Sequence, residues 1–278
     1  MKNNYLKWIF SCLLLGLSTV VIAQNQIPAD WKLGSQAYTF RLFSLEETLE
    51  KLNSIGVRYV ELYPGQKIQK AGEATTAFSM SQENLEIIKD LLRKYNIEAV
   101  GYGVISPSDE DWPKVFAFAK ELGIGIITTE LKPNQFDLVE KLCEQYGIKI
   151  AIHNHPLPSL YWHPEVPLRL LENRSNLMGV CADIGHWVRS GLDPVECLQK
   201  LEGRIISLHV KDLNQRGVRS AHDVPWGKGN SNVAGVLHEL NRQGFKGVFS
   251  AEYEHNWENN LPDLKESMEY FKRVASQF

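Results

Sequence analysis

The chain has few cysteines, and no two of them have the spacing of a CxxC motif. Four cysteines occur in 278 residues. Three of them, Cys143, Cys181 and Cys197, lie in apolar patterns typical of helices or strands. Buried cysteines in such patterns behave as small apolar side chains, so we expect free thiols instead of a disulfide scaffold.

The sequence also lacks an excess of positive charge. It contains 30 Lys and Arg against 33 Asp and Glu, a net charge of −3. Nucleic-acid-binding domains usually carry a basic surface, so we expect no nucleic-acid partner. No glycine-rich dinucleotide fingerprint follows the first predicted strand, which disfavours a Rossmann fold. Low-complexity linkers, blocks of charge and close internal repeats are missing as well.

The first 23 residues have the features of a secretory signal peptide. Lys2 and Lys7 precede a short apolar run at 8–22, and the residues just before Gln24 fit the small-residue cleavage rule. The run is short for a bilayer span, and no second one follows. We therefore predict a signal peptide over 1–23, export to the periplasm or cell surface, and no stable membrane insertion after cleavage. An uncleaved anchor is the alternative. Loss of the two lysines changes the net charge from −3 to −5.

Strand-like and helix-like patterns alternate along residues 24–278. This segment is close to the ~250 residues of one (β/α)8 barrel. Regular alternation favours a barrel over an open doubly wound sheet. We therefore predict an α/β fold consisting of a single (β/α)8 TIM barrel over 24–278. The predicted strands are 33–39, 58–62, 97–102, 124–129, 148–153, 178–182, 204–209 and 247–252. The predicted helices are 45–55, 81–95, 110–122, 134–146, 164–172, 193–202, 232–242 and 262–276.

Side chains that can bind a metal occur where four predicted strands end. The carboxyl ends of parallel barrel strands meet at one face, which is where barrel enzymes carry their active sites. A group of carboxylates there would repel itself without a cation, although each one alone could cap a helix or form an ion pair. One imidazole and three carboxylates suit one divalent metal ion, with Mn²⁺ or Mg²⁺ favoured and Zn²⁺ or Co²⁺ as alternatives. The predicted metal ligands are Glu130, Asp183, His209 and Glu252.

Other residues near the strand ends are candidates for moving protons. The fifth strand ends with His153 and His155, and Lys211 follows His209 by two residues on the same side of the seventh strand. A lysine beside a metal can stabilise an enolate or transfer a proton. An ion pair of Lys211 with Asp212 or Glu252 is the alternative.

Further residues are candidates for binding a substrate. His186 follows Asp183 by three residues and either bonds a substrate hydroxyl or caps the next helix. Trp226 lies in a polar loop, where a ring can stack on the apolar face of a sugar or pack the loop onto the barrel rim. Glu61 is near the predicted end of the second strand, where a sugar contact and an ion pair at the barrel end are both consistent with the pattern.

Four segments resemble the xylose isomerase-like barrel superfamily, which includes sugar isomerases, epimerases, inosose dehydratase and class II apurinic endonucleases. They are CADIGH at 181–186, SLHVKD at 207–212, PWGKG at 225–229 and FSAE at 249–252. In the epimerases of this group a glutamate, an aspartate, a histidine and a glutamate on strands five to eight hold a metal. The last three match Asp183, His209 and Glu252.

The fifth strand departs from that pattern. It reads AIHNH at 151–155, with histidines and no glutamate. The inosose dehydratase branch is similar in having histidines there and a glutamate at the end of strand four. The resemblance therefore assigns the fourth ligand to Glu130, with His155 or His153 as the alternative.

The expected function is a divalent-metal-dependent isomerase or epimerase that converts a sugar or keto-sugar through an enediolate. A metal-dependent dehydratase or lyase acting on a keto-sugar or inosose-type substrate is the alternative, because of the strand-five histidines. A nuclease is disfavoured by the acidic balance, and a non-catalytic sugar-binding barrel is a third class. The partner is a small carbohydrate, and a homo-oligomer is left open. The catalytic candidates are His155, Lys211 and Glu252, and the substrate-binding candidates are Glu61, His153, His186 and Trp226.

Overall fold

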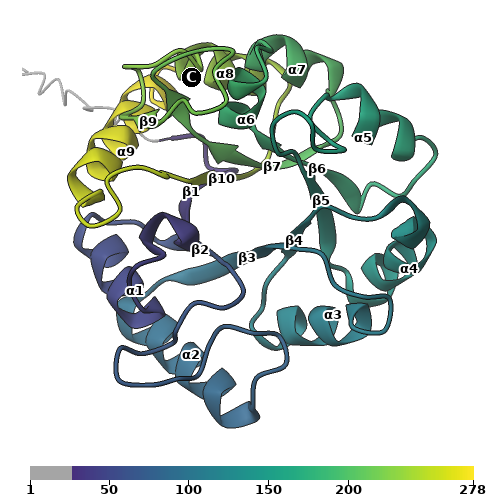
Figure 1. Ribbon diagram of the computed structural model, residues 1–278, viewed down its shortest axis with the longest axis vertical. Coiled ribbons are helices and arrows are strands. Elements are labelled where there is room, and N and C mark those ends of the chain that lie inside the picture. Colours follow the sequence, from purple (N-terminus) through teal and green to yellow (C-terminus); the bar gives the residue numbers. More distant parts are fainter. Residues whose placement is uncertain (1–26) are drawn as a thin grey trace, which may run out of the picture.

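The computed structural model of the protein describes residues 27–278. Eight parallel strands form a closed barrel in the order β1-β10-β7-β6-β5-β4-β3-β2, and helices surround it (Figure 1). The predicted (β/α)8 barrel is therefore confirmed, while the predicted signal peptide over 1–23 lies outside the described residues. The barrel strands are β1 (Trp31–Gln36), β2 (Tyr59–Leu62), β3 (Glu98–Ile105), β4 (Ile126–Thr129), β5 (Lys149–His153), β6 (Met178–Asp183), β7 (Ile205–Val210) and β10 (Gly247–Ala251).

The helices agree with the predicted segments to within about two residues at nearly every end. Their ends follow local chemistry. Ser44 and Glu47 form a capping box at the start of α1, and Asn96 closes α2 in the left-handed conformation at φ 51°. The helices are α1 (Leu45–Ser54), α2 (Gln82–Tyr95), α3 (Trp112–Glu121), α4 (Phe136–Tyr146), α5 (Glu165–Leu170), α6 (Ile184–Arg189), α7 (Pro194–Lys200), α8 (Val233–Arg242) and α9 (Leu261–Ala275), with 3-10 turns η1 (Ala37–Phe40) and η2 (Pro133–Gln135).

Two features were not predicted. The short helix α6 begins immediately after β6, because the Asp183 carboxylate accepts a hydrogen bond from the backbone N–H of His186 and caps the helix. The long loop after β7 contains a small antiparallel sheet of β8 (Asp212–Leu213) and β9 (Asp223–Val224).

Strand register brings the predicted site residues to one end of the barrel. Asp183 on β6 is opposite His209 on β7, and Ser250 on β10 is opposite His209 from the other side. His153 is opposite Cys181 on β6. The strands are parallel, so the residues that follow these positions emerge together at the carboxyl face.

The main apolar core lies between the barrel and the surrounding helices. Trp31, Phe249 and Phe271 pack there with ring centroids 4.7 to 5.9 Å apart. Cys143, Cys181 and Cys197 are buried free thiols, as the sequence predicts.

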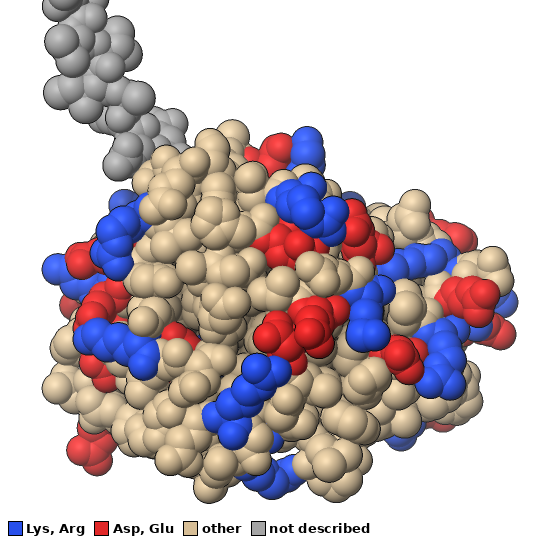
Figure 2. Space-filling model, turned by 90° about the horizontal axis from the view of Figure 1, so that it is seen from above, with Lys and Arg blue, Asp and Glu red and all other residues tan. Residues whose placement is uncertain are grey.

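Among residues 27–278, every helix is too short or too polar to cross a membrane. On the face shown in Figure 2, basic and acidic side chains are interspersed.

Candidate active site

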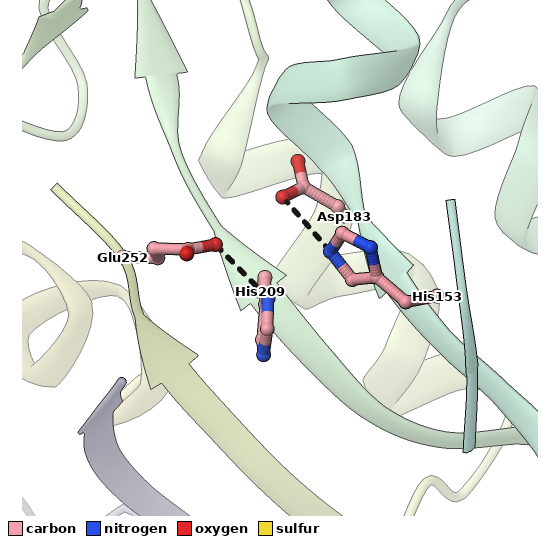
Figure 3. A group of neighbouring side chains, drawn as sticks. All are labelled: His153, Asp183, His209 and Glu252. Atoms are coloured by element: carbon pink, nitrogen blue, oxygen red, sulfur yellow. Dashed lines mark ion pairs between the residues drawn. The ribbon is translucent and has the colours of Figure 1, made fainter. Parts of the chain in front are cut away.

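Four side chains from four neighbouring strands converge at the carboxyl end of the barrel (Figure 3). They are all buried, and each offers a metal-binding atom within 4.8 Å of the others. Three of them are predicted ligands, but the fourth is His153, which the sequence analysis kept only as an alternative to Glu130. The four residues are His153 on β5, Asp183 on β6, His209 on β7 and Glu252 directly after β10.

Asp183 is fixed by hydrogen bonds to its backbone and to one carboxylate oxygen. The Asn154 amide donates to the Asp183 carbonyl and accepts from the Asp183 N–H, both at 2.9 Å. Asp183 Oδ1 accepts from the His186 N–H at 2.7 Å. The other oxygen, Oδ2, faces the site at 3.5 Å from His153 Nε2 and 3.6 Å from His186 Nε2. Oδ1 therefore caps the start of α6, while Oδ2 faces the other site residues.

His209 lies between two carboxylates. Its Nε2 is 2.9 Å from Glu61 Oε2, and its Nδ1 is 3.0 Å from Glu252 Oε2 without the alignment of a hydrogen bond. Burial disfavours a charged imidazole, but neighbouring Cys181, Glu61 and Glu252 outweigh burial and raise the pKa of His209 well above its usual range. Because Nε2 is bound to Glu61, Nδ1 is the ring nitrogen that faces the other three residues of the site.

Glu61 lies inside the barrel beneath His209. Its carboxylate accepts hydrogen bonds from Thr128 Oγ1 at 2.6 Å and Ser250 Oγ at 2.9 Å, and the residue is 2% exposed. Burial would raise the pKa of Glu61, but His209 and the two hydroxyls lower it below its usual value. Of the two interpretations left open for Glu61, a sugar contact and an ion pair at the barrel end, the structure shows the ion pair, with His209, where Glu61 sets the orientation of that ring.

His153 has no hydrogen-bond partner at either ring nitrogen, although both atoms are buried. Burial lowers the pKa of His153, so the ring is neutral at physiological pH. A buried polar side chain without partners is unusual and needs an explanation. A neutral imidazole is a common metal ligand, and the site around His153 therefore fits a divalent cation.

The ammonium group of Lys211 also lies in this site. Lys211 Nζ is 2.7 Å from Asp183 Oδ2, 2.5 Å from Glu252 Oε2 and 3.4 Å from Glu254 Oε2. Burial would lower the pKa of Lys211, but these carboxylates raise it well above its usual range. The ion pair with Glu252 was one of the two predicted alternatives. Asp212 has a different role, because it accepts backbone N–H bonds in the following loop.

Glu130 and His155 form a separate pair nearer the mouth. His155 Nδ1 is 2.5 Å from Glu130 Oε1, and the His155 side chain is 46% exposed. Burial lowers the pKa of His155, but the Glu130 carboxylate outweighs it and raises that pKa overall. Glu130 is grouped with His153 and His155 and not with the other three predicted ligands.

A pocket of about 360 Å³ opens above these groups. Its lining includes three histidines and two carboxylates from the site, aromatic and polar residues near the ends of β1 and β2, and Gly103 and Val104 of β3. This composition, with polar groups converging in a cleft of modest size, is typical of a small-molecule site. The lining residues include Gln36, Tyr38, Tyr63, His153, His155, His186, Glu252 and Glu254.

Comparison with known proteins shows which family the chain belongs to. The sequence profile described as xylose isomerase-like TIM barrel matches residues 49–274. The chain belongs to this family. The match spans all of the strands that carry the site, from β2 to β10.

Similar proteins are spread over several activities. The chain is 38% identical to a Parabacteroides distasonis protein, with a TM-score of 0.73, covering 88% of this chain and 99% of that one. A D-tagatose 3-epimerase-like protein has the same fold at 22% identity and a TM-score of 0.69, covering 87% of this chain and 96% of that one. An inosose dehydratase of Clostridium botulinum is 28% identical over 52% of this chain and 54% of its own length. A rhizopine catabolism protein of Rhizobium meliloti is 29% identical over 50% and 47%. The chain thus spans about half the length of the curated relatives it matches.

Trp226 was predicted to bind the substrate, but the structure places it outside the candidate site, in the apolar core. It is 3% exposed, its ring packs 6.1 Å from that of Phe271, and its backbone N–H donates to Ser267 Oγ on α9. The prediction of a sugar contact is corrected: the loop packs this large apolar ring into the core, where its burial stabilises the fold.

Replacing Trp226 with alanine is expected to lower the free energy of unfolding by about 3–5 kcal/mol, because it leaves a large cavity in the core. Affinity for a divalent metal should be unchanged in the folded variant. Urea unfolding and metal titration measure the two quantities. Trp162→Ala, at a partly exposed position, is the matched control and should be milder. A stable Trp226→Ala variant would contradict the core assignment.

Three residues of the site were not predicted from the sequence. Asn154 holds the backbone of Asp183, and Arg189 lies 3.0 Å from His186 Nδ1 and 3.2 Å from Glu254 Oε2. Glu254 could have been identified, because it follows Glu252 by two residues at the same strand end. Arg189 is the last residue of α6, a helix that the sequence pattern did not predict.

Proposed function

We propose that the protein is a divalent-metal-dependent isomerase or epimerase of a sugar or keto-sugar. The observation that carries this proposal is the convergence of two imidazoles and two carboxylates beside the pocket, which His153 and Glu252 line. Both ring nitrogens of His153 and Nδ1 of His209 are buried there without a hydrogen bond. Membership of the xylose isomerase-like family, with epimerases among its structural neighbours, supports the substrate class.

His153, Asp183, His209 and Glu252 would hold the metal. A second imidazole in place of a third carboxylate favours Mn²⁺, Co²⁺ or Zn²⁺ and weakens the argument for Mg²⁺ that rested on three carboxylates. When bound, the cation would polarise a substrate carbonyl and make the adjacent C–H more acidic. The protein's own groups would then have to bind the sugar and move the proton.

His155 is the best-placed group to move that proton. Its Nδ1 is bound to Glu130, which leaves Nε2 for the substrate, and the ring lines the pocket. The Glu130 carboxylate fixes the ring orientation, as expected for a base that acts on a bound molecule. Glu252 reaches the same pocket from β10, so one of these two groups can accept a proton from the substrate while the other, in its protonated form, supplies one.

His186 and the pocket rim would orient the sugar. His186 Nε2 is 3.6 Å from Asp183 and its Nδ1 is near Arg189, and the ring lines the pocket. Tyr38 and Tyr63 meet edge to face at 5.2 Å on the opposite rim. Aromatic rims of this kind contact the apolar faces of sugars, while polar groups fix the hydroxyls.

A dehydratase is the second candidate. The specific support is the similarity to inosose dehydratases, together with the strand-five histidines, which the sequence analysis associates with that branch. The same proton transfer by His155 would then be followed by loss of a β-hydroxyl instead of reprotonation. The two candidates share the site and differ in the fate of the intermediate.

Metal analysis combined with proton NMR in heavy water tests the proposal. On a panel of sugars and keto-sugars, we expect solvent deuterium to enter one carbon of the substrate, and exhaustive chelation to stop this exchange. His155→Gln should retain metal but lose exchange. A new alkene with loss of water would identify the dehydratase. Sugar binding without exchange, unaffected by chelation, would contradict both and indicate a non-catalytic binding protein.

A further inference from the structure

The Lys211 ammonium group occupies the space between the two carboxylates that would hold the metal. It contacts Asp183 Oδ2 at 2.7 Å and Glu252 Oε2 at 2.5 Å, and these are the oxygens that face His153 and His209 (Figure 3). A divalent cation bound by the same oxygens would be close to this ammonium and would repel it. The two cations therefore compete for one position.

The Lys211 side chain is held along most of its length. It is 1% exposed, and it packs so closely on Gly185 that a Cβ there would lie 2.5 Å from Lys211 Cβ and 3.1 Å from Cδ. The glycine therefore lets the lysine stem pass against the backbone at the start of α6. Only the end of the side chain is free to change partners without moving the strand.

A third acceptor, Glu254, lies beside the first two. Glu254 Oε2 is 3.4 Å from Lys211 Nζ, and the Glu254 side chain is 23% exposed at the edge of the pocket. Arg189 Nη1 donates to the same oxygen at 3.2 Å, which holds Glu254 in place. An ammonium that leaves Asp183 and Glu252 therefore reaches another carboxylate with a small movement and stays paired, as a buried charge requires.

We propose that Lys211 is a built-in cation that exchanges with the metal. In the metal-free protein its ammonium neutralises Asp183 and Glu252, which would otherwise repel each other. When a divalent cation binds, the ammonium moves to Glu254. Lys211 thereby keeps the site assembled without metal and weakens metal affinity by the free energy of its displacement. This inference rests on the proposed function, because it requires a metal at the same four residues.

Two substitutions shift metal affinity in opposite directions. Lys211→Met keeps the side-chain length but removes the competing charge, so Mn²⁺ should bind on the order of 10-fold more tightly, within the range of coupling between two binding events. Glu254→Gln removes the third carboxylate, the one that would receive the displaced ammonium, so the ammonium is harder to displace and Mn²⁺ should bind more weakly. A purely structural role for these residues would weaken metal binding in both variants.

Calorimetric titration of Mn²⁺ into the metal-free full chain measures these affinities. Lys246→Met, an exposed lysine paired with Asp30 at the opposite end of the barrel, is the matched control and should bind as the wild type does. Thermal unfolding gives a second readout: metal should raise the melting temperature of Lys211→Met by more than that of the wild type. Lys211→Gln should behave as Lys211→Met and serves if the methionine variant does not fold.

Failure of the proposed exchange and failure of the proposed metal site give different results. Equal or weaker Mn²⁺ binding by Lys211→Met and Lys211→Gln, with a wild type that binds metal, overturns the exchange and leaves the proposed function standing. Absence of binding by the wild type and all variants, with Mn²⁺, Co²⁺ and Zn²⁺ each tried, overturns the metal site itself and the exchange with it.

Discussion

Replacing Glu252 with glutamine is expected to reduce turnover on the order of 1,000-fold or more, the range for loss of a positioned proton-transferring group. The substitution keeps the shape of the side chain and removes its charge. Glu252 Oε2 is 3.0 Å from His209 Nδ1 and 2.5 Å from Lys211 Nζ, so it belongs both to the proposed metal ligands and to the ion pairs around them. Metal retention should therefore fall together with turnover.

The measurement is the deuterium-exchange rate at saturating Mn²⁺ combined with metal titration of the folded variant. Glu258→Gln, the same change at an exposed position of the same loop, is the control and should leave both quantities unchanged. Circular dichroism verifies that the Glu252 variant is folded. A variant that exchanges deuterium at the wild-type rate would remove Glu252 from the site.

Much of the fold could be predicted because each strand–helix unit is encoded locally. Apolar runs of strand length alternate with amphipathic segments, and the parallel register then places Asp183, His209 and Glu252 together without further information. Three of the four clustered residues therefore follow from strand ends alone.

The fourth member could not be chosen from spacing. Glu130 follows the last residue of β4, while His153 is the last residue of β5, and both are compatible with the carboxyl face. Which side chain reaches the centre depends on the direction of each Cβ, and the sequence does not give it. Glu130 reaches His155 instead.

Loops were predicted least well, because their packing depends on contacts distant in sequence. The loop after β7 buries Trp226 against Phe271, 45 residues further along the chain. Polarity of the neighbouring residues suggested an exposed ring. The proposed export of the protein rests on residues 1–23 alone and stays a prediction.

Replacing Glu61 with glutamine is expected to weaken metal binding by about 10- to 100-fold, the usual effect of removing a partner that orients a metal-binding histidine. Glu61 does not line the pocket, and it contacts the site through His209, whose Nε2 lies 2.9 Å from Glu61 Oε2. The glutamine keeps the shape of the side chain and one acceptor oxygen, while its amide N–H donates to the hydroxyl of Thr128 or Ser250 that faces it. The variant therefore removes the negative charge and one acceptor. Titration of Mn²⁺ measures the effect.

A double-mutant cycle separates orientation of His209 from general stabilisation of the barrel. If Glu61 acts through the ring, Glu61→Gln should cost little metal affinity in a His209→Gln background, because the partner it orients is already gone. Additive losses would contradict this role. Glu98→Gln, an exposed glutamate at the other end of the barrel, is the control for charge alone. Gly101 supports the assignment independently: a Cβ there would lie 2.9 Å from Glu61 Cγ, so the barrel wall leaves room for this carboxylate beneath His209.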